Sequence, residues 1–87
     1  MNKQQIIDEV LCELTSAKKK WPRYYMDIIH AVSLVNEEAG EAIQAALDYT
    51  YDHGSKEKIK KELIQAAAMC FRALENWDDL TFFQHEI

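Results

Sequence analysis

Three glutamates fall within five residues, and their spacing suits the binding of a cation. Glu37, Glu38 and Glu41 lie in the segment "EEAGE", and a separation of three residues puts Glu38 and Glu41 on one face of a helix. Carboxylates gathered in a partly dry cleft must take up protons or bind a cation, because like charges repel there. A hard divalent ion held by oxygen fits this set. We expect Mg²⁺ first, with Mn²⁺ or Ca²⁺ as alternatives.

An ordinary solvated helix face is the competing interpretation, because any bundle helix carries a polar side opposite an apolar one. Solvated faces usually mix Lys with Glu, which gains a few tenths of a kcal/mol for each favourable pair. The predicted helix over residues 25–52 contains no Lys or Arg at all. Its unrelieved negative charge indicates that something compensates it.

The elements that must position these glutamates are predicted to be three helices. Apolar residues at spacings of three and four predict a first helix over residues 3–19, which Pro22 ends. A second helix over about 25–52 stops at Gly54, which suits the left-handed position past a helix end, and Ser55 caps a third helix over 56–77. Residues 78–87 form a tail. The sequence therefore predicts one all-α domain over residues 1–87, built on an antiparallel helical hairpin.

The hairpin brings a second acidic element to the first. In an antiparallel pair, residues at equal depth have position numbers with equal sums, which places Glu41 opposite Glu62 and Glu38 opposite Gln65. Glu62 and Gln65 are again three residues apart on one helix face. Glu38, Glu41 and Glu62 are therefore expected to converge, with Glu37 at the side.

This pattern is similar to that of a known family. "EEAGE" followed by "ELIQ" resembles the EExxE…ExxD signature of the MazG-like all-α nucleoside triphosphate pyrophosphohydrolases, over roughly half of the chain. The resemblance implies Mg²⁺-dependent hydrolysis of a nucleoside triphosphate between its α and β phosphates. It also implies that Glu38, Glu41 and Glu62 are metal ligands and that Glu37 is a ligand or orients water.

One position departs from the family signature. Gln65 stands where the family has Asp, and it offers a neutral carbonyl oxygen in place of a charged ligand. We expect weaker metal binding as a result. A degenerate relative that binds nucleotide without turnover is the alternative that this substitution leaves open.

Further residues are predicted to contact substrate, each with an ordinary structural alternative. A salt bridge to Asp27 or Glu75 is the alternative for Arg72, a hydrogen bond to Asp27 or Glu37 for His30, and packing at the bundle end for Trp21. Lys58 shares a helix face with Glu62, from which it could reach phosphates. The predicted substrate-binding residues are Trp21, His30, Lys58 and Arg72.

The composition of the chain restricts the classes of partner and the cellular location that we expect. Fifteen acids against ten Lys and Arg give a net charge of −5, which disfavours nucleic acid and acidic membrane surfaces. No apolar run approaches a membrane span, so we expect a cytoplasmic protein in which Cys12 and Cys70 are buried, unpaired thiols. The short chain and the apolar segment "AAAMCF" predict a homodimer or homotetramer in which hairpins form four-helix bundles. A non-catalytic helical interaction protein is the rival function.

Overall fold

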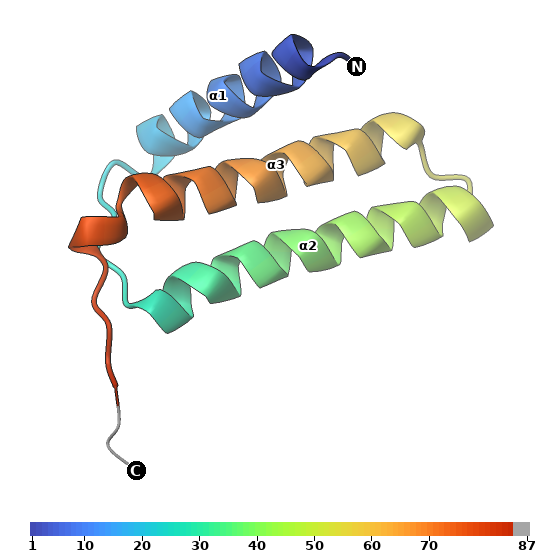
Figure 1. The fold of residues 1–87 in the computed structure, drawn as a ribbon. Coiled ribbons are helices and arrows are strands. Elements are labelled where there is room, and N and C mark those ends of the chain that lie inside the picture. Colours follow the sequence, from blue (N-terminus) through green and yellow to red (C-terminus); the bar gives the residue numbers. More distant parts are fainter. Residues whose placement is uncertain (85–87) are drawn as a thin grey trace.

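The computed structural model describes residues 1–84, and its helices form an open layer (Figure 1). Three α-helices, α1 (Lys3–Lys20), α2 (Ile28–Tyr51) and α3 (Lys56–Glu75), precede a short 3₁₀ helix, η1 (Trp77–Asp79). Within residues 1–84 the only strand-like pairing is a single bridge between Asp27 and Thr81. The predicted all-α fold is thereby confirmed. None of the helices in this part of the chain has both the length and the apolar character that crossing a membrane requires.

Side-chain caps determine where α2 and α3 begin. Asp27 caps α2, and its Oδ1 accepts a hydrogen bond from the His30 backbone N–H at 2.7 Å. α2 therefore starts at Ile28, later than the predicted position near residue 25. Ser55 caps α3 by accepting from the Lys58 N–H at 3.1 Å. Both caps satisfy amide groups that have no partner within the helix itself.

The turn between α2 and α3 uses its glycine differently from the prediction. His53, with φ of 61°, takes the left-handed conformation that we assigned to Gly54. Gly54 instead passes close over the end of α2, where its N–H donates to the Asp48 carbonyl at 2.9 Å. A Cβ at this position would lie 2.7 Å from the Tyr49 nitrogen, so the close approach requires glycine.

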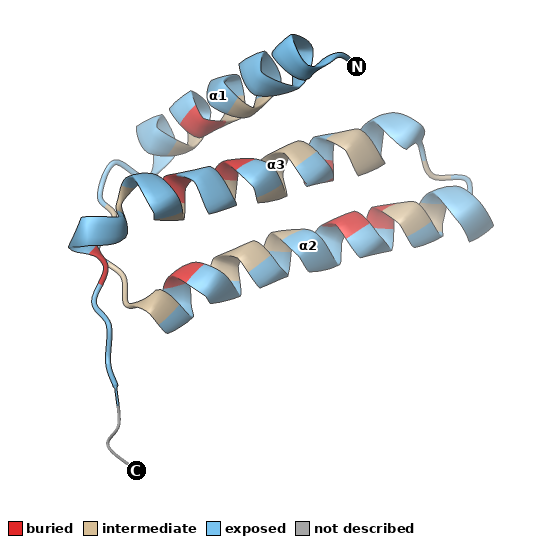
Figure 2. Ribbon diagram, viewed as in Figure 1, coloured by how far each residue is buried: buried red, intermediate tan, exposed pale blue. Residues whose placement is uncertain are grey.

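α3 lies in the middle of the layer, with α1 along one side and α2 antiparallel to it along the other (Figure 1). Small residues occupy the buried positions of α2, and Ala68 of α3 is fully buried (Figure 2). The buried residues of α2 are Ala31, Ala42 and Ala45. Alanines at these positions let helix backbones approach closely, so longer side chains on flanking positions can meet across the contact.

The open layer leaves much apolar surface uncovered. The total solvent-accessible surface is 6940 Å². A folded monomer of this mass typically exposes about 5,300 Å², so this chain exposes roughly 1,600 Å² more. On α2 and α3 the large exposed aliphatic side chains recur at helical spacings. They are Ile29, Val32, Ile43 and Leu47 on α2, and Leu63 and Leu74 on α3.

The prediction that both cysteines are buried is wrong for this chain. Cys12 and Cys70 are free thiols, as predicted, but both are exposed. A closed bundle would cover residues on most sides of a helix, whereas an open layer buries only the two seams along α3. Cys70 lies three and four residues from Ala67 and Leu74, on the uncovered side of α3.

The tail packs on the start of α2. The Thr81 carbonyl accepts from the Ile28 N–H at 2.9 Å, and the Thr81 N–H donates to the Met26 carbonyl at 3.1 Å. Leu80 is buried, and the rings of Trp77 and Phe82 lie 4.9 Å apart. The predicted tail over 78–87 includes residues 85–87, which lie outside the described part of the chain.

A buried arginine joins the end of α1 to α3. Arg72, only 4% exposed, donates hydrogen bonds to the backbone carbonyls of Trp21 and, at 3.4 Å, Ala17. Its guanidinium also lies 5.1 Å from the centre of the Tyr24 ring. These carbonyls lie at the end of α1, which carries the negative end of the helix dipole, so a cation stabilises them. The salt bridge to Asp27 or Glu75, which was the structural alternative for Arg72, is not found among the described residues.

We predict that Arg72→Met lowers the free energy of unfolding by about 1.5–3 kcal/mol, because two charge-assisted hydrogen bonds are lost inside the protein. Urea unfolding followed by circular dichroism measures the change. Lys18→Ala is the control, since it removes only the neighbouring exposed Lys18–Glu75 ion pair at 2.7 Å. Such a pair contributes at most about 1 kcal/mol. Equal effects of the two substitutions would show that Arg72 does not join α1 to α3.

Candidate carboxylate site

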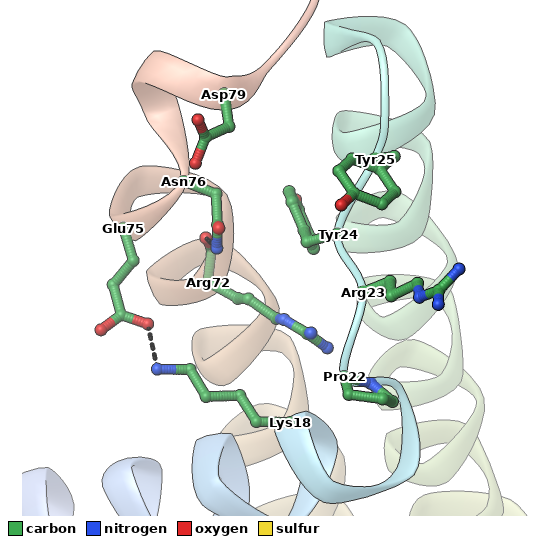
Figure 3. A pocket seen from close by; sticks show the side chains of 9 residues that line it. All are labelled: Lys18, Pro22, Arg23, Tyr24, Tyr25, Arg72, Glu75, Asn76 and Asp79. Carbon is green, nitrogen blue, oxygen red and sulfur yellow. Dashed lines mark hydrogen bonds and ion pairs between the residues drawn. The ribbon is translucent and has the colours of Figure 1, made fainter.

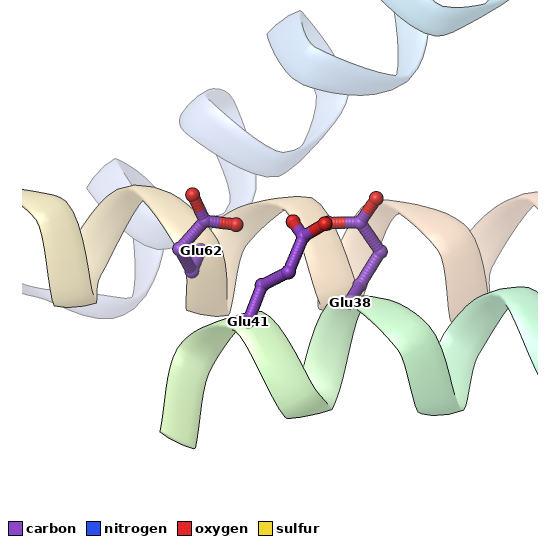
Figure 4. Close-up of side chains that lie close together, drawn as sticks. All are labelled: Glu38, Glu41 and Glu62. Atoms are coloured by element: carbon purple, nitrogen blue, oxygen red, sulfur yellow. The ribbon is translucent and has the colours of Figure 1, made fainter. Parts of the chain in front are cut away.

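Three carboxylates from two helices meet at the contact between α2 and α3 (Figure 4). Glu38 and Glu41 come from α2 and Glu62 from α3, and one oxygen of each lies within 4.8 Å of the others. Glu62 is 3% exposed, Glu38 is half-buried and Glu41 is exposed. The juxtaposition that the helix register predicts is therefore present, and the group opens toward solvent on the side of Glu41.

Two oxygens of this group are buried without any hydrogen-bond partner among the described residues. They are Oε2 of Glu38 and Oε2 of Glu62. A buried carboxylate oxygen that has lost its water and gained no donor is costly. Oxygen ligands at this mutual distance suit a hard divalent cation, which would supply the missing interactions. The donor set therefore fits Mg²⁺ or Mn²⁺.

The electrostatics of the group differ from one carboxylate to the next. Partial burial raises the pKa of Glu38 above its usual value, and the nearby carboxylates of Glu41, Glu62 and Glu37 raise it further. The pKa of Glu62 is lowered, chiefly because the Lys58 ammonium lies 2.8 Å from its Oε1. The same contact raises the pKa of Lys58. The charged form of Glu62 is thus stabilised by Lys58, whereas the charged form of Glu38 is destabilised by burial and by the neighbouring carboxylates.

The structure places the other predicted ligands near this group but outside it. Glu37 is exposed, beside Glu38 on α2. Gln65 is half-buried, one turn beyond Glu62 on α3. Because of this position, the amide carbonyl of Gln65 lies on the same helix face as the Glu62 carboxylate.

Of the predicted substrate-binding residues, only Lys58 lies at the carboxylates. Arg72 is ten residues from Glu62, about 15 Å along α3 at 1.5 Å per residue, and its guanidinium is engaged with backbone carbonyls. Trp21 is 69% exposed at the same end of the molecule. His30 is also exposed, and its contact with Asp27 involves the backbone N–H and not the imidazole.

A separate pocket of about 680 Å³ lies at that end of the molecule, where the chain between α1 and α2 passes over the end of α3 (Figure 3). Arg72 is the one predicted substrate-binding residue among its lining residues, because the walls meet only after this chain segment folds back. The basic and aromatic run around Lys18 to Tyr25 was the available signal. Its lining residues are Lys18, Pro22, Arg23, Tyr24, Tyr25, Arg72, Glu75, Asn76 and Asp79.

Comparison of the chain with protein-family models, with curated proteins and with solved structures finds no match in any of the three.

Substitutions of two of the carboxylates should change stability in opposite directions in the metal-free protein. The raised pKa of Glu38 means that its ionisation opposes folding, so Glu38→Gln should raise the melting temperature at neutral pH. The lowered pKa of Glu62 means that its charged form favours folding, so Glu62→Gln should lower it.

Thermal melts in EDTA between neutral pH and about pH 3 measure both effects. The gain from Glu38→Gln should shrink as the pH falls through the raised pKa of Glu38. The loss of melting temperature caused by Glu62→Gln should persist below the ordinary carboxyl pKa. It should disappear only as the pH falls through the lowered pKa of Glu62. Shifts of the same sign for the two variants at neutral pH would contradict this description of the site.

Proposed function

We propose that this protein is a metal-dependent nucleoside triphosphate pyrophosphohydrolase of the MazG-like type, which converts a nucleoside triphosphate to a monophosphate and pyrophosphate. One observation carries the proposal: Glu38, Glu41 and Glu62 converge from two helices, and two of their buried oxygens have no partner within residues 1–84. The similarity of "EEAGE" and "ELIQ" to the family signature supports the same reading. Mg²⁺ bound here would neutralise phosphate charge and activate water.

The residues of the site have different roles in the proposed reaction. Glu38, Glu41 and Glu62 would hold the cation through carboxylate oxygens, and Gln65 would add at most a neutral carbonyl. Glu37 is exposed beside Glu38, where its carboxylate can orient a water molecule and accept its proton. Because Gln65 carries no negative charge, the affinity for metal should be lower. The alternative function is therefore that of a relative that binds nucleotide without turnover.

The proposed partner is a second copy of this chain. The exposed surface exceeds that of a typical monomer by roughly 1,600 Å², which matches the area that each chain buries in an obligate dimer. On each of α2 and α3 the exposed aliphatic residues share one arc of the helix when their positions are projected. Packing these arcs of two chains together would form a four-helix bundle and would cover Cys70. A homotetramer would join two of these dimers.

Activity is tested with a panel of nucleoside triphosphates in Mg²⁺ or Mn²⁺, scored for pyrophosphate release. We predict turnover of at least one nucleotide, and Glu41→Gln should reduce it at least about 10- to 100-fold, the effect typical of residues that only support a metal ligand. Glu57→Gln, an exposed glutamate of α3 outside the group of three, should retain activity.

The same samples distinguish the rival, a non-catalytic interaction protein that the exposed apolar surface also supports. Mg²⁺ at 100 times its dissociation constant should stabilise the fold by about 2.7 kcal/mol if the carboxylates bind it. A melting temperature that does not respond to Mg²⁺, together with no pyrophosphate from any nucleotide, would refute the enzyme and favour the rival.

The dimer is tested by placing charge on its proposed interface. Val32→Glu and Ile43→Glu should convert the protein to a monomer in light scattering, because each puts an unpaired carboxylate into an apolar contact. His30→Glu is the matched control, since His30 is exposed and projects about 140–160° from Ile43 and Val32 around α2. A wild-type chain that is monomeric at all concentrations would contradict the dimer.

A further inference from the structure

The carboxylate site already contains one cation, the ammonium of Lys58. Its Nζ lies 2.8 Å from Oε1 of Glu62, one turn further along α3. The two side chains differ sharply in environment, because that of Glu62 is 4% exposed and that of Lys58 is 57% exposed. The anion is therefore fixed at the helix contact, whereas the cation reaches in from solvent on a flexible stem.

A divalent ion at the three carboxylates would compete with this ammonium. Both cations draw on the negative charge of Glu62, and two positive charges a few ångströms apart repel each other. In the described part of the chain, Oε2 of Glu62 has no partner while Oε1 contacts Lys58, so one ammonium does not satisfy the carboxylate fully. Lys58 can withdraw at little cost, because a lysine stem has many rotamers and most of this side chain is already in water.

The withdrawn ammonium would remain next to the site. Lys58 lies in the first turn of α3, on the helix face that carries Glu62. A phosphate group drawn to the metal would meet an ammonium that had just lost its carboxylate partner. Lysine serves as a point charge for phosphates in such positions, without the fixed geometry that arginine imposes.

We infer that Lys58 is an exchangeable counter-ion: its ammonium neutralises Glu62 while no metal is bound, yields that carboxylate to a divalent cation, and then contacts the polyphosphate of the substrate. The inference rests on the proposed cation site and adds a residue that couples metal binding to phosphate binding.

The test is a calorimetric titration of the full chain with Mn²⁺, followed by titration of the Mn²⁺-loaded protein with inorganic tripolyphosphate. Lys58→Met should bind Mn²⁺ about two- to fivefold more tightly than wild type, the range expected for one partly exposed ion pair. It should also bind tripolyphosphate more weakly, and Lys58→Arg should restore that binding. A purely structural role would not produce tighter metal binding.

Lys60→Met is the matched control, because Lys60 lies on the same helix and its ammonium pairs with Glu9 of α1, at 3.8 Å. It should leave both affinities unchanged. Wild-type Mn²⁺ binding with equal or weaker binding by Lys58→Met would overturn the inference while leaving the cation site intact. No Mn²⁺ binding by wild type or variant would overturn the cation site and the inference together. Tighter Mn²⁺ binding without any loss of tripolyphosphate binding would overturn the phosphate contact.

Discussion

Repulsion among carboxylates at the contact of α2 and α3 is the constraint on which the rest of the structure depends. Glu38, Glu41 and Glu62 lie within a few ångströms of one another, and α2 contributes no Lys or Arg to offset them. Lys58 is the cation paired with them among the described residues, and it leaves two buried oxygens without a partner. Such an arrangement weakens a fold unless a ligand compensates it, so it is more readily explained by binding than by stability.

The geometry of the layer connects this seam to the exposed apolar surface. α3 is held from both sides, by α1 and by α2, while Val32, Ile43 and Leu74 remain exposed. The acids lie at the contact of α2 and α3, and Val32 and Ile43 project about 160–180° from Glu41 around α2, so a second chain could cover them without filling the site. One pair of helices can therefore serve both the proposed chemistry and the proposed assembly.

Much of the fold could be predicted from local signals. Apolar periodicity identified three helices, the Ser55 cap marked the start of α3, and equal depth along antiparallel helices placed Glu41 opposite Glu62. These features depend on short-range chemistry and helix geometry, which a single sequence records. The charge pattern of α2 added the information that its acids need compensation.

The features that the sequence did not predict depend on contacts between segments far apart in the chain. Arg72 was predicted to contact substrate, with a salt bridge to a carboxylate as the alternative. Backbone carbonyls at the end of α1 hold it, and no pattern within α3 indicates that. The two cysteines share helical positions with apolar residues, yet the open layer leaves both exposed. In the turn, His53 takes the left-handed conformation because Gly54 is needed for close passage over α2.

The most direct measurement is a crystal structure of the protein grown with Mn²⁺, with anomalous diffraction used to locate the ion. The account predicts an anomalous peak among the oxygens of Glu38, Glu41 and Glu62, with Lys58 turned away from Glu62. A well-ordered map in which these carboxylates carry no peak, and Lys58 still contacts Glu62 at high Mn²⁺ concentration, would contradict it.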